Sequence, residues 1–362
     1  MTDHSASNLI EPLADGPLDI IGDVHGEIEV LDRLLQQLGY DEDGYCHGQR
    51  KLVFLGDLID RGPDSPAVVD KVMTMVDNGT AQCLMGNHEL NILINRPLPG
   101  NGWCIQPNPL EAQNQYDSRP ANDEQKARYT RFFSELPLAL ENDALRLVHA
   151  CWHTPSVDRL RENRALRLPV KELYKWLELE VGDTLQQANL QRQMAKEKET
   201  WAVRIEDRDW PARILTAHAQ AEILGQMKHP IRVLTTGRVG IASKPFFAAG
   251  RWRMIELSSW WDDYDEIIPV VIGHFWRQYD NASKRVAGVW GRDVFEGVDS
   301  HAWMGKRNNV YCVDYSVGQL HLERRKQQNP QAFHGKLAAL RFPEWEVHHD
   351  DGSVIALESA PA

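Results

Sequence analysis

Three apolar runs in the first quarter of the chain each lead into a glycine that is followed by acidic, amide or histidine side chains. The runs are 18–21, 52–55 and 83–85, and the motifs that follow are GDVHG, GDLIDRG and GNHE. Apolar residues recur at helical spacing over 27–38 and 65–77, between the runs. Strand–helix–strand alternation of this kind is typical of right-handed βαβ units. We therefore expect an α/β fold with a parallel sheet at its centre.

The pattern along the chain predicts four segments. Residues 1–16 are polar and predict a flexible N-terminal arm, and 17–156 hold the motifs and form the first half of the core. Residues 157–230 are heavily charged with helical periodicity, so we expect a helical insertion or cap. Residues 231–362 then form a second, β-rich half, in which the short alternating runs of 309–357 predict antiparallel strands. The Pro-, Asn- and Gly-rich stretch 97–122 predicts a long surface loop.

Composition limits the partners of the chain. The 362 residues carry a formal net charge of −12, which argues against affinity based on neutralising a nucleic-acid backbone and against a membrane-surface role. Five scattered cysteines without a C-x-x-C pair predict reduced thiols. The N-terminus resembles no signal peptide, and no apolar run is long enough to cross a membrane. We expect a soluble, cytoplasmic protein.

Polar side chains that metals use follow five of the apolar runs. Functional residues of open α/β sheets collect beyond the carboxyl ends of the strands, so these side chains are expected to meet. Carboxylate and amide oxygens combined with imidazoles suit Mn²⁺, Fe or Zn²⁺. Two such cations, about 3.5–4 Å apart, form a clamp for phosphoryl displacement. The candidate ligands are Asp23, His25, Asp57, Asn87, His149 and His274.

The three motifs, in this order and followed by VHA and GH, resemble the calcineurin-like metallophosphoesterase superfamily. The form of the motifs is most similar to the phosphoprotein phosphatase branch and its bacterial relatives, which include diadenosine tetraphosphate hydrolases. The resemblance covers 18–150 and 267–322. It implies a four-layer α/β/β/α sandwich and two divalent metal ions, with Mn²⁺ favoured and Fe or Zn²⁺ as alternatives.

The resemblance also implies a role for each candidate ligand. Asp23 and His25 would bind the first metal, Asp57 would bridge both, and the second metal would be bound by Asn87, His149 and His274. Many members of the superfamily carry a second histidine in the last motif, GHxH. Here the motif is GHFW, and Trp276 cannot bind a metal. This departure is shared with the phosphoprotein phosphatase pattern.

Three further residues are expected to act on the substrate. By the resemblance, His88 is the general acid that protonates the leaving oxygen, and Asp60 holds it in its charged form. Imidazole suits this task because it titrates near neutrality. Arg61 is suited to bind phosphate oxygens in a bidentate manner. Arg253 is a further substrate-binding candidate, although a solvated arginine would look the same in sequence.

The expected chemistry is direct attack on phosphorus by a hydroxide that bridges the two metals. Asp60 and GHFW favour a phosphomonoesterase of the serine/threonine protein phosphatase type. The alternative is hydrolysis of dinucleoside polyphosphates or another nucleotide, favoured by VHACWH and by Met85 before GNHE. A non-enzymatic scaffold is the third hypothesis, and the intact set of candidate ligands argues against it.

Overall fold

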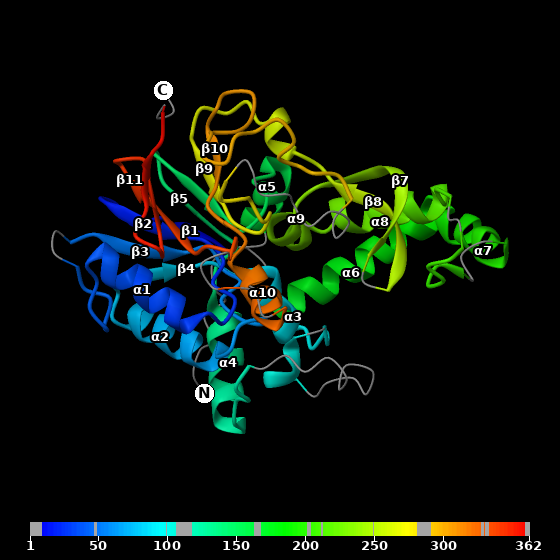
Figure 1. Ribbon diagram of the computed structural model, residues 1–362. Coiled ribbons are helices and arrows are strands. Elements are labelled where there is room, and N and C mark those ends of the chain that lie inside the picture. The colour runs from blue at the N-terminus through cyan, green and yellow to red at the C-terminus, as the bar shows by residue number, and fades with distance from the viewer. Residues whose placement is uncertain are drawn as a thin grey trace.

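Two mixed β-sheets face each other, and helices flank them (Figure 1). The computed structural model describes residues 9–46, 49–98, 100–105, 118–162, 168–200, 204–210, 213–248, 250–280, 291–326, 329 and 333–358. Within these residues one sheet has six strands in the order β13-β12-β11-β2-β3-β4, and the other has five in the order β1-β5-β6-β9-β10. The predicted α/β sandwich is confirmed.

The parallel part of the six-stranded sheet is formed by the three runs that precede the motifs. β2 (Leu18–Ile21), β3 (Lys51–Phe54) and β4 (Ala81–Cys83) pair in parallel, and α1 (Ile28–Leu38) and α2 (Ser65–Asp77) connect them. The strands are continuous apolar runs because both of their faces are buried. α1 buries one apolar face and ends at Gly39, which adopts φ +86°.

The C-terminal strands complete this same sheet. β11 (Ala338–Phe342) pairs antiparallel with β2, and β12 (Glu346–His349) and β13 (Val354–Ala356) follow it outward. The five-stranded sheet likewise takes strands from both halves of the chain. These are β1 (Ile10–Pro12), β5 (Ala139–Glu141), β6 (Arg146–Val148), β9 (Val270–Ile272) and β10 (Val310–Cys312). The two halves therefore interleave, whereas the sequence pattern pointed to one sheet from each.

The local structure differs from the sequence expectations in four places. β10, expected in an antiparallel sheet, pairs in parallel with β9. Residues 1–8 of the expected arm lie outside the described residues, but 10–12 form β1, because the side chains of Leu9, Ile10 and Leu13 are buried against the sheets. Residues 320–325, expected as a strand, form α10 (Leu320–Arg325), in which Leu320 and Glu323 are buried at helical spacing. The start of the β-rich half is also helical: α9 (Pro230–Thr236) begins with a proline at its first position.

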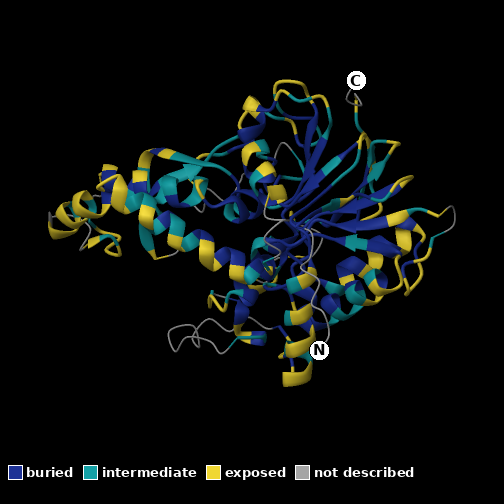
Figure 2. Ribbon diagram, turned by 180° about the vertical axis from the view of Figure 1, so that it is seen from behind, coloured by how far each residue is buried: buried dark blue, intermediate teal, exposed yellow. Residues whose placement is uncertain are grey.

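A helical unit with its own hairpin extends from one side of the sheets (Figure 1). It comprises α6 (Val170–Gln187), α7 (Leu190–Thr200), α8 (Thr216–Met227), β7 (Val239–Ala248) and β8 (Arg251–Leu257). Within the unit, α8 packs against α6, α7 and both strands of the hairpin. α5 (Thr154–Glu162) contacts α9 and β1 beside the five-stranded sheet. Figure 2 shows buried residues concentrated in the strands, while the outer end of the helical unit is mostly exposed.

The largest apolar cluster includes residues of the sheets and of the helices that flank them, and a second, smaller cluster lies between the two sheets. Ile20 and Val53 from one sheet and Leu147 and Val271 from the other belong to this smaller cluster.

α3 (Asn87–Leu93) follows β4, and α4 (Asp123–Glu135) follows the expected loop 97–122. In that loop, 99 and 106–117 lie outside the described residues, and a short 3-10 helix, η1 (Asn101–Trp103), is described. No helix among the described residues is long and apolar enough to span a membrane.

Candidate metal centre

The candidate ligands lie together because they follow the ends of five strands. Asp23 and His25 follow β2, Asp57 follows β3, Asn87 begins α3 behind β4, His149 follows β6, and His274 follows β9. Backbone hydrogen bonds fasten the loops to one another. The amides of Val24 and His25 both donate to the carbonyl of Asp57, at 3.0 and 2.9 Å, and the amide of Gly273 donates to that of His149 at 2.9 Å. The two sheets thus contribute to a single site.

Two groups of ligand atoms share the carboxylate of Asp57. His25, Asp57 and His88 form one group and Asp57, His149 and His274 the other, with the ligand atoms of each group within 4.8 Å of one another. Asp57 Oδ2 lies 3.9 Å from His25 Nε2 and 3.7 Å from His88 Nε2. Asp57 Oδ1 lies 3.4 Å from His149 Nε2. Because its two oxygens face different groups, this carboxylate is placed to bridge two cations.

Asp23 and Asn87 lie at the edges of these groups. Asp23 Oδ2 is 3.6 Å from His25 Nε2, and Asp23 Oδ1 accepts a hydrogen bond from the His274 amide at 3.0 Å. Asn87 Oδ1 lies 3.2 Å from His149 Nε2. Asp23 Oδ2 is buried and has no hydrogen-bond partner among the residues that the structure describes, which is a costly arrangement unless a cation satisfies it. The donor set therefore fits a pair of divalent metal ions.

Hydrogen bonds to backbone carbonyls orient two of the imidazoles. His25 Nδ1 lies 3.0 Å from the Ile59 carbonyl, and His149 Nδ1 lies 2.8 Å from the Leu55 carbonyl. A carbonyl can only accept, so Nδ1 of each ring is the donor. Nε2 of each ring then faces the carboxylates, which is the orientation of a metal-binding histidine. Burial opposes protonation of His149, but the Asp57 carboxylate raises the pKa of this ring to about 10.

The electrostatics of the centre favour positive charge between the carboxylates. Burial opposes ionisation of Asp57, but the imidazoles of His149 and His88 hold the pKa of this carboxyl well below its usual value. For Asp23, burial and then the nearby Asp314 raise the pKa well above its usual value. Burial and His149 lower the pKa of His274 to about 3, so this ring is neutral and keeps a lone pair for a metal.

His88 takes part in a second set of contacts. Its Nδ1 lies 2.6 Å from Asp60 Oδ2, which matches the pairing expected from the sequence. Arg61 Nη2 lies 3.3 Å from His88 Nε2, and Arg61 Nη1 lies 2.5 Å from His25 Nε2. The Arg61 guanidinium also stacks over the ring of Trp276, 4.6 Å from its centroid. The sequence did not indicate that His88 lies within the first ligand group as well.

Glycine is required where the motifs approach one another most closely. A Cβ on Gly86 would lie 2.2 Å from Asp57 Oδ1, and one on Gly273 would lie 2.3 Å from Asp23 Oδ1. Real Cβ atoms do not make contacts this short, so any side chain here would displace a candidate ligand. These two glycines keep the loops close enough to share the centre.

Sequence reasoning missed two acidic residues of the site. Glu89, inside GNHE, accepts hydrogen bonds from the amides of Asp57 (2.8 Å), Leu58 (2.8 Å) and Gly86 (3.0 Å) and so joins the second motif to the third. Asp314 accepts from the amides of Trp276 and Ser316 at 2.9 and 2.8 Å. It follows β10, so the strand-end reasoning that located the candidate ligands could have located Asp314 too.

Arg253 lies on β8 of the helical unit's hairpin. Its Nε donates to the Ala248 carbonyl at 3.2 Å, and burial followed by the neighbouring Arg251 lowers its pKa. Among the described residues, no hydrogen bond or ion pair joins Arg253 to the metal centre. The structure therefore leaves its substrate-binding role as a prediction.

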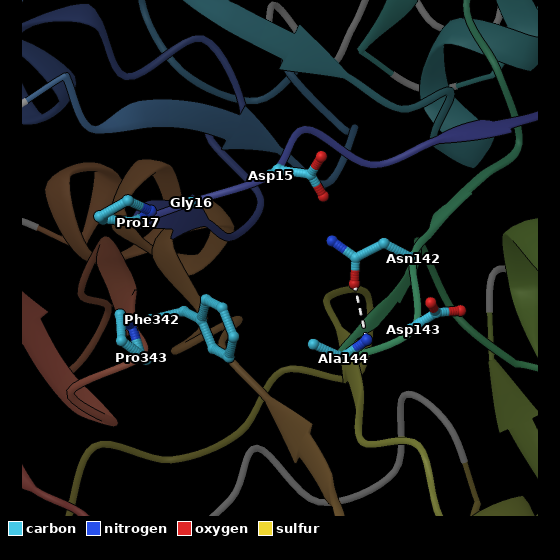
Figure 3. Close-up of a pocket in the computed structure, with 8 residues that line it drawn as sticks. All are labelled: Asp15, Gly16, Pro17, Asn142, Asp143, Ala144, Phe342 and Pro343. Carbon is cyan, nitrogen blue, oxygen red and sulfur yellow. Dashed lines mark hydrogen bonds between the residues drawn. The ribbon is translucent and has the colours of Figure 1, made fainter.

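A cavity of about 380 Å³ lies at the other end of the strands (Figure 3). It is lined by residues just before β2, between β5 and β6, and at the end of β11, with the ring of Phe342 on one side and Asn142 on the other (Figure 3). The Asn142 side chain accepts a hydrogen bond from the Ala144 amide at 2.9 Å and thereby holds its turn. Since the motifs follow the carboxyl ends of the strands, this cavity is separate from the candidate centre.

Comparison with known proteins decides the family. The model of the calcineurin-like phosphoesterase family matches residues 16–218, which is more than half of the chain. The chain belongs to the calcineurin-like phosphoesterase family. The match includes every candidate ligand of this phosphoesterase except His274.

Two curated relatives of this calcineurin-like phosphoesterase carry the same name, asymmetrical bis(5'-nucleosyl)-tetraphosphatase PrpE. The protein of Oceanobacillus iheyensis is 49% identical over 74 residues, which are 20% of this chain and 30% of that protein. The protein of Geobacillus sp. strain WCH70 is 34% identical over 141 residues, which are 37% of this chain and 56% of that protein. The chain thus matches between about a third and just over half of their length.

Among solved structures, the phosphoesterase is similar to the cold-active protein-tyrosine phosphatase of a psychrophilic Shewanella species. The sequence identity is 14% and the TM-score is 0.45, with 97% of this chain and 82% of that chain covered.

Proposed function

We propose that the protein is a metal-dependent phosphoesterase that hydrolyses dinucleoside polyphosphates. The observation that carries this proposal is the likeness to two asymmetrical bis(5'-nucleosyl)-tetraphosphatases, together with two His and Asp ligand groups that share Asp57. It reverses the order of preference drawn from the motifs, because the relatives favour the alternative over a serine/threonine protein phosphatase. The word "asymmetrical" in the relatives' name predicts cleavage of a tetraphosphate into a mono- and a triphosphate.

In this proposal six residues hold a pair of divalent ions, Mn²⁺ by preference and Fe or Zn²⁺ as alternatives. They are Asp23, His25, Asp57, Asn87, His149 and His274. When bound, such a pair supplies positive charge for the phosphate oxygens and lowers the pKa of water. The two groups differ in their neighbours. Arg61 contacts His25 and His88 of the first group, whereas His149 and His274 of the second group follow strands of the five-stranded sheet.

Arg61 and His88 then have separate roles toward the substrate. Arg61 binds non-bridging phosphate oxygens, and its stacking on Trp276 holds the guanidinium plane in place. His88 gives a proton from Nε2 to the leaving oxygen, while its Nδ1–H remains bonded to Asp60. We assign His88 this role because its Nε2 lies 3.3 Å from Nη2 of Arg61, the residue proposed to bind the phosphate, while its Nδ1 is held by Asp60.

A second candidate is a phosphomonoesterase of the protein phosphatase type. The same contact, between His88 and Asp60 at 2.6 Å, supports it. A serine or threonine alkoxide is a poor leaving group and needs a proton at the moment of bond cleavage. A histidine whose Nδ1 is held by a carboxylate is oriented to supply that proton from Nε2.

We further propose that residues 157–230 are an insertion that shapes access to the centre and that Arg253 contacts the substrate beyond the reacting phosphate. Arg253 is half-buried, and Arg251 and Arg96 add positive charge around it. Replacing Arg253 with Met should raise KM for a dinucleoside tetraphosphate about tenfold. KM for a small aryl phosphate should be unchanged. An equal change in both values would contradict the contact.

The proposed function is tested with one substrate panel. Diadenosine tetraphosphate, a phosphoserine peptide and bis(4-nitrophenyl) phosphate are offered to the purified protein in Mn²⁺, with Zn²⁺ and Fe in parallel. We expect the highest kcat/KM for diadenosine tetraphosphate, by at least about tenfold, with AMP and ATP as products. A preference for the peptide would instead support the second candidate. No turnover and no metal uptake would support a scaffold.

A further inference from the structure

We propose that Asn101 and Trp103 are positioning residues that hold the Asp60–His88 pair in the orientation needed to donate a proton. Neither belongs to the three motifs: they lie in η1, 41 and 43 residues beyond Asp60 in the chain. The inference depends on the general-acid role proposed above for His88. It adds two residues from a different part of the chain to those that support proton donation by His88.

The Asp60 carboxylate is completely buried and accepts hydrogen bonds from three side chains. Asn101 Nδ2 and His88 Nδ1 both lie 2.6 Å from Oδ2, and Trp103 Nε1 lies 2.6 Å from Oδ1. The exposed fraction of Asp60 is 0%. A buried carboxylate is stable as an anion only when N–H or O–H donors replace water. Two of the three donors that do so here come from η1.

Each of the two η1 donors has a fixed direction. Asn101 Oδ1 accepts from the Leu98 amide at 2.8 Å, which leaves the NH₂ group of the same side chain to face Asp60. The indole of Trp103 donates only through Nε1, and its ring lies next to that of Tyr129, with 6.2 Å between centroids. Both side chains are buried, with exposed fractions of 2% and 3%. Neither donor can turn away without disturbing its own neighbours.

The consequence concerns the direction of the histidine ring. A carboxylate bonded only to His88 could rotate about its own torsions and carry the ring with it. Donors on both oxygens restrict that rotation and thereby aim Nε2 of His88 toward the side of Asp57, 3.7 Å away. Asp60 adopts φ +70°, an unusual conformation for a residue with a side chain, which persists only because the surrounding contacts hold it. Its amide is held in addition by Ser65 Oγ at 2.9 Å.

The test compares two phosphate esters that differ in their need for a proton. Trp103→Phe removes the N–H while keeping an aromatic ring, and Asn101→Ala removes the other donor. For an alkyl phosphate, whose leaving group needs protonation, we expect each variant to lower kcat about tenfold with little change in KM. For 4-nitrophenyl phosphate, whose leaving group is stable as an anion, the loss should be less than about twofold. In a His88→Asn background, Trp103→Phe should have no further effect.

A matched control separates this effect from a general loss of packing. Trp303 is also a buried tryptophan, and its Nε1 has no hydrogen-bond partner among the described residues. Trp303→Phe should therefore leave the ratio of the two ester rates unchanged. Equal losses on both esters for Trp103→Phe, or an additive effect in the His88→Asn background, would overturn the proposal. If Trp103→Phe does not fold, Asn101→Ala answers the same question.

A spectroscopic readout keeps the proposal separate from the proposed function. A short hydrogen bond from His88 Nδ1 to an ionised carboxylate gives a proton resonance far downfield, which can be recorded on protein free of paramagnetic metal. We expect this resonance in the native protein, its loss in Asp60→Asn, and a shift or loss in Trp103→Phe but not in Trp303→Phe. An unchanged resonance in Trp103→Phe would refute the positioning role. That result would leave open which substrate is hydrolysed, whereas failure of the substrate panel would leave this resonance unaffected.

Discussion

Glu89→Gln should damage the centre although Glu89 binds no metal in the proposed scheme. Oε2 accepts from the amides of Asp57 and Gly86, and Oε1 accepts from that of Leu58. A glutamine has one carbonyl oxygen. If that oxygen takes the place of Oε2, the NH₂ group faces the Leu58 amide, and two donors meet without an acceptor.

The magnitude follows from those two buried donors. Each unsatisfied donor costs about 1–3 kcal/mol, so the variant should lose about 2–6 kcal/mol in its free energy of unfolding. A domain has about 5–15 kcal/mol in total, so over most of that range the variant still folds. The loop that presents Asp57 would relax away from the Leu58 clash. Because Asp57 belongs to both ligand groups, the variant should then bind both metals more weakly.

Denaturant unfolding and elemental analysis measure the two effects. Burial and the Asp57 charge raise the pKa of Glu89 to about 7, so the measurements are made at pH 8, where ionised glutamate differs most from glutamine. Glu323→Gln is the matched control, since Glu323 is also buried and accepts from the His334 amide at 3.0 Å, and its hydrogen bonds among the described residues do not include a candidate ligand. It should lose stability but keep its metals. Full metal content in both variants would refute the reasoning.

Three further predictions concern the centre and its support. Asp57→Asn should abolish binding of both metals, and elemental analysis that finds two equivalents in the variant would contradict the bridging role. In Gly318→Ala a Cβ would lie 2.5 Å from His25 Cδ2 and 2.6 Å from Arg61 Nη1, so KM for any phosphate substrate should rise about tenfold or more; an unchanged KM would count against Arg61 as the phosphate ligand. Burial and then Arg232 lower the pKa of His229 to about 3, against 6.5 for an exposed histidine. The unfolded state therefore takes up the proton first as pH falls, and stability should decrease between about pH 6.5 and pH 3 by as much as about 4 kcal/mol. Thermal unfolding of His229→Asn should depend less on pH over that range, and an identical dependence would exclude this histidine as the cause.

The candidate ligands could be located from sequence because their positions follow from strand ends. Asp23 and Asp57 each follow an apolar run that pairs in parallel with the next. Parallel neighbours end on the same side of a sheet, so two residues far apart in sequence must lie close together. The same reasoning extends to His149 and His274, since β6 and β9 also pair in parallel.

The arrangement of the sheets could not be derived in this way. Strand pairing between distant segments depends on which faces bury the most apolar surface, and local periodicity does not record the partner. β11 pairs with β2, more than 300 residues earlier in the chain, and β1 pairs with β5. The run around Leu320 also alternates like a strand, yet Ser316 before it adopts φ +62° and turns the chain out of extended structure.

The residues that hydrogen-bond to Asp60 could not be predicted from the sequence for a different reason. Asn101 and Trp103 lie in a Pro-, Asn- and Gly-rich stretch without periodicity, and nothing in their spacing connects them to Asp60. A hydrogen bond of a side chain depends on the path of the loop that carries it. Sequence patterns predict where helices and strands end. They predict very little about the path of an irregular loop and the side chains that it brings to a site.

His88 and the hydrogen bonds that hold Asp60 do not by themselves distinguish the two proposed substrates. Cleavage of a phosphoanhydride expels a phosphate group that is stable as an anion, whereas cleavage of a phosphoserine expels a basic alkoxide. A well-oriented His88 is needed more for the second reaction, yet it does not hinder the first. The contacts around Asp60 therefore fit both candidate functions. Discrimination between them depends on groups that bind the rest of the substrate. Arg253, on the hairpin of the helical unit, is the candidate predicted from the sequence.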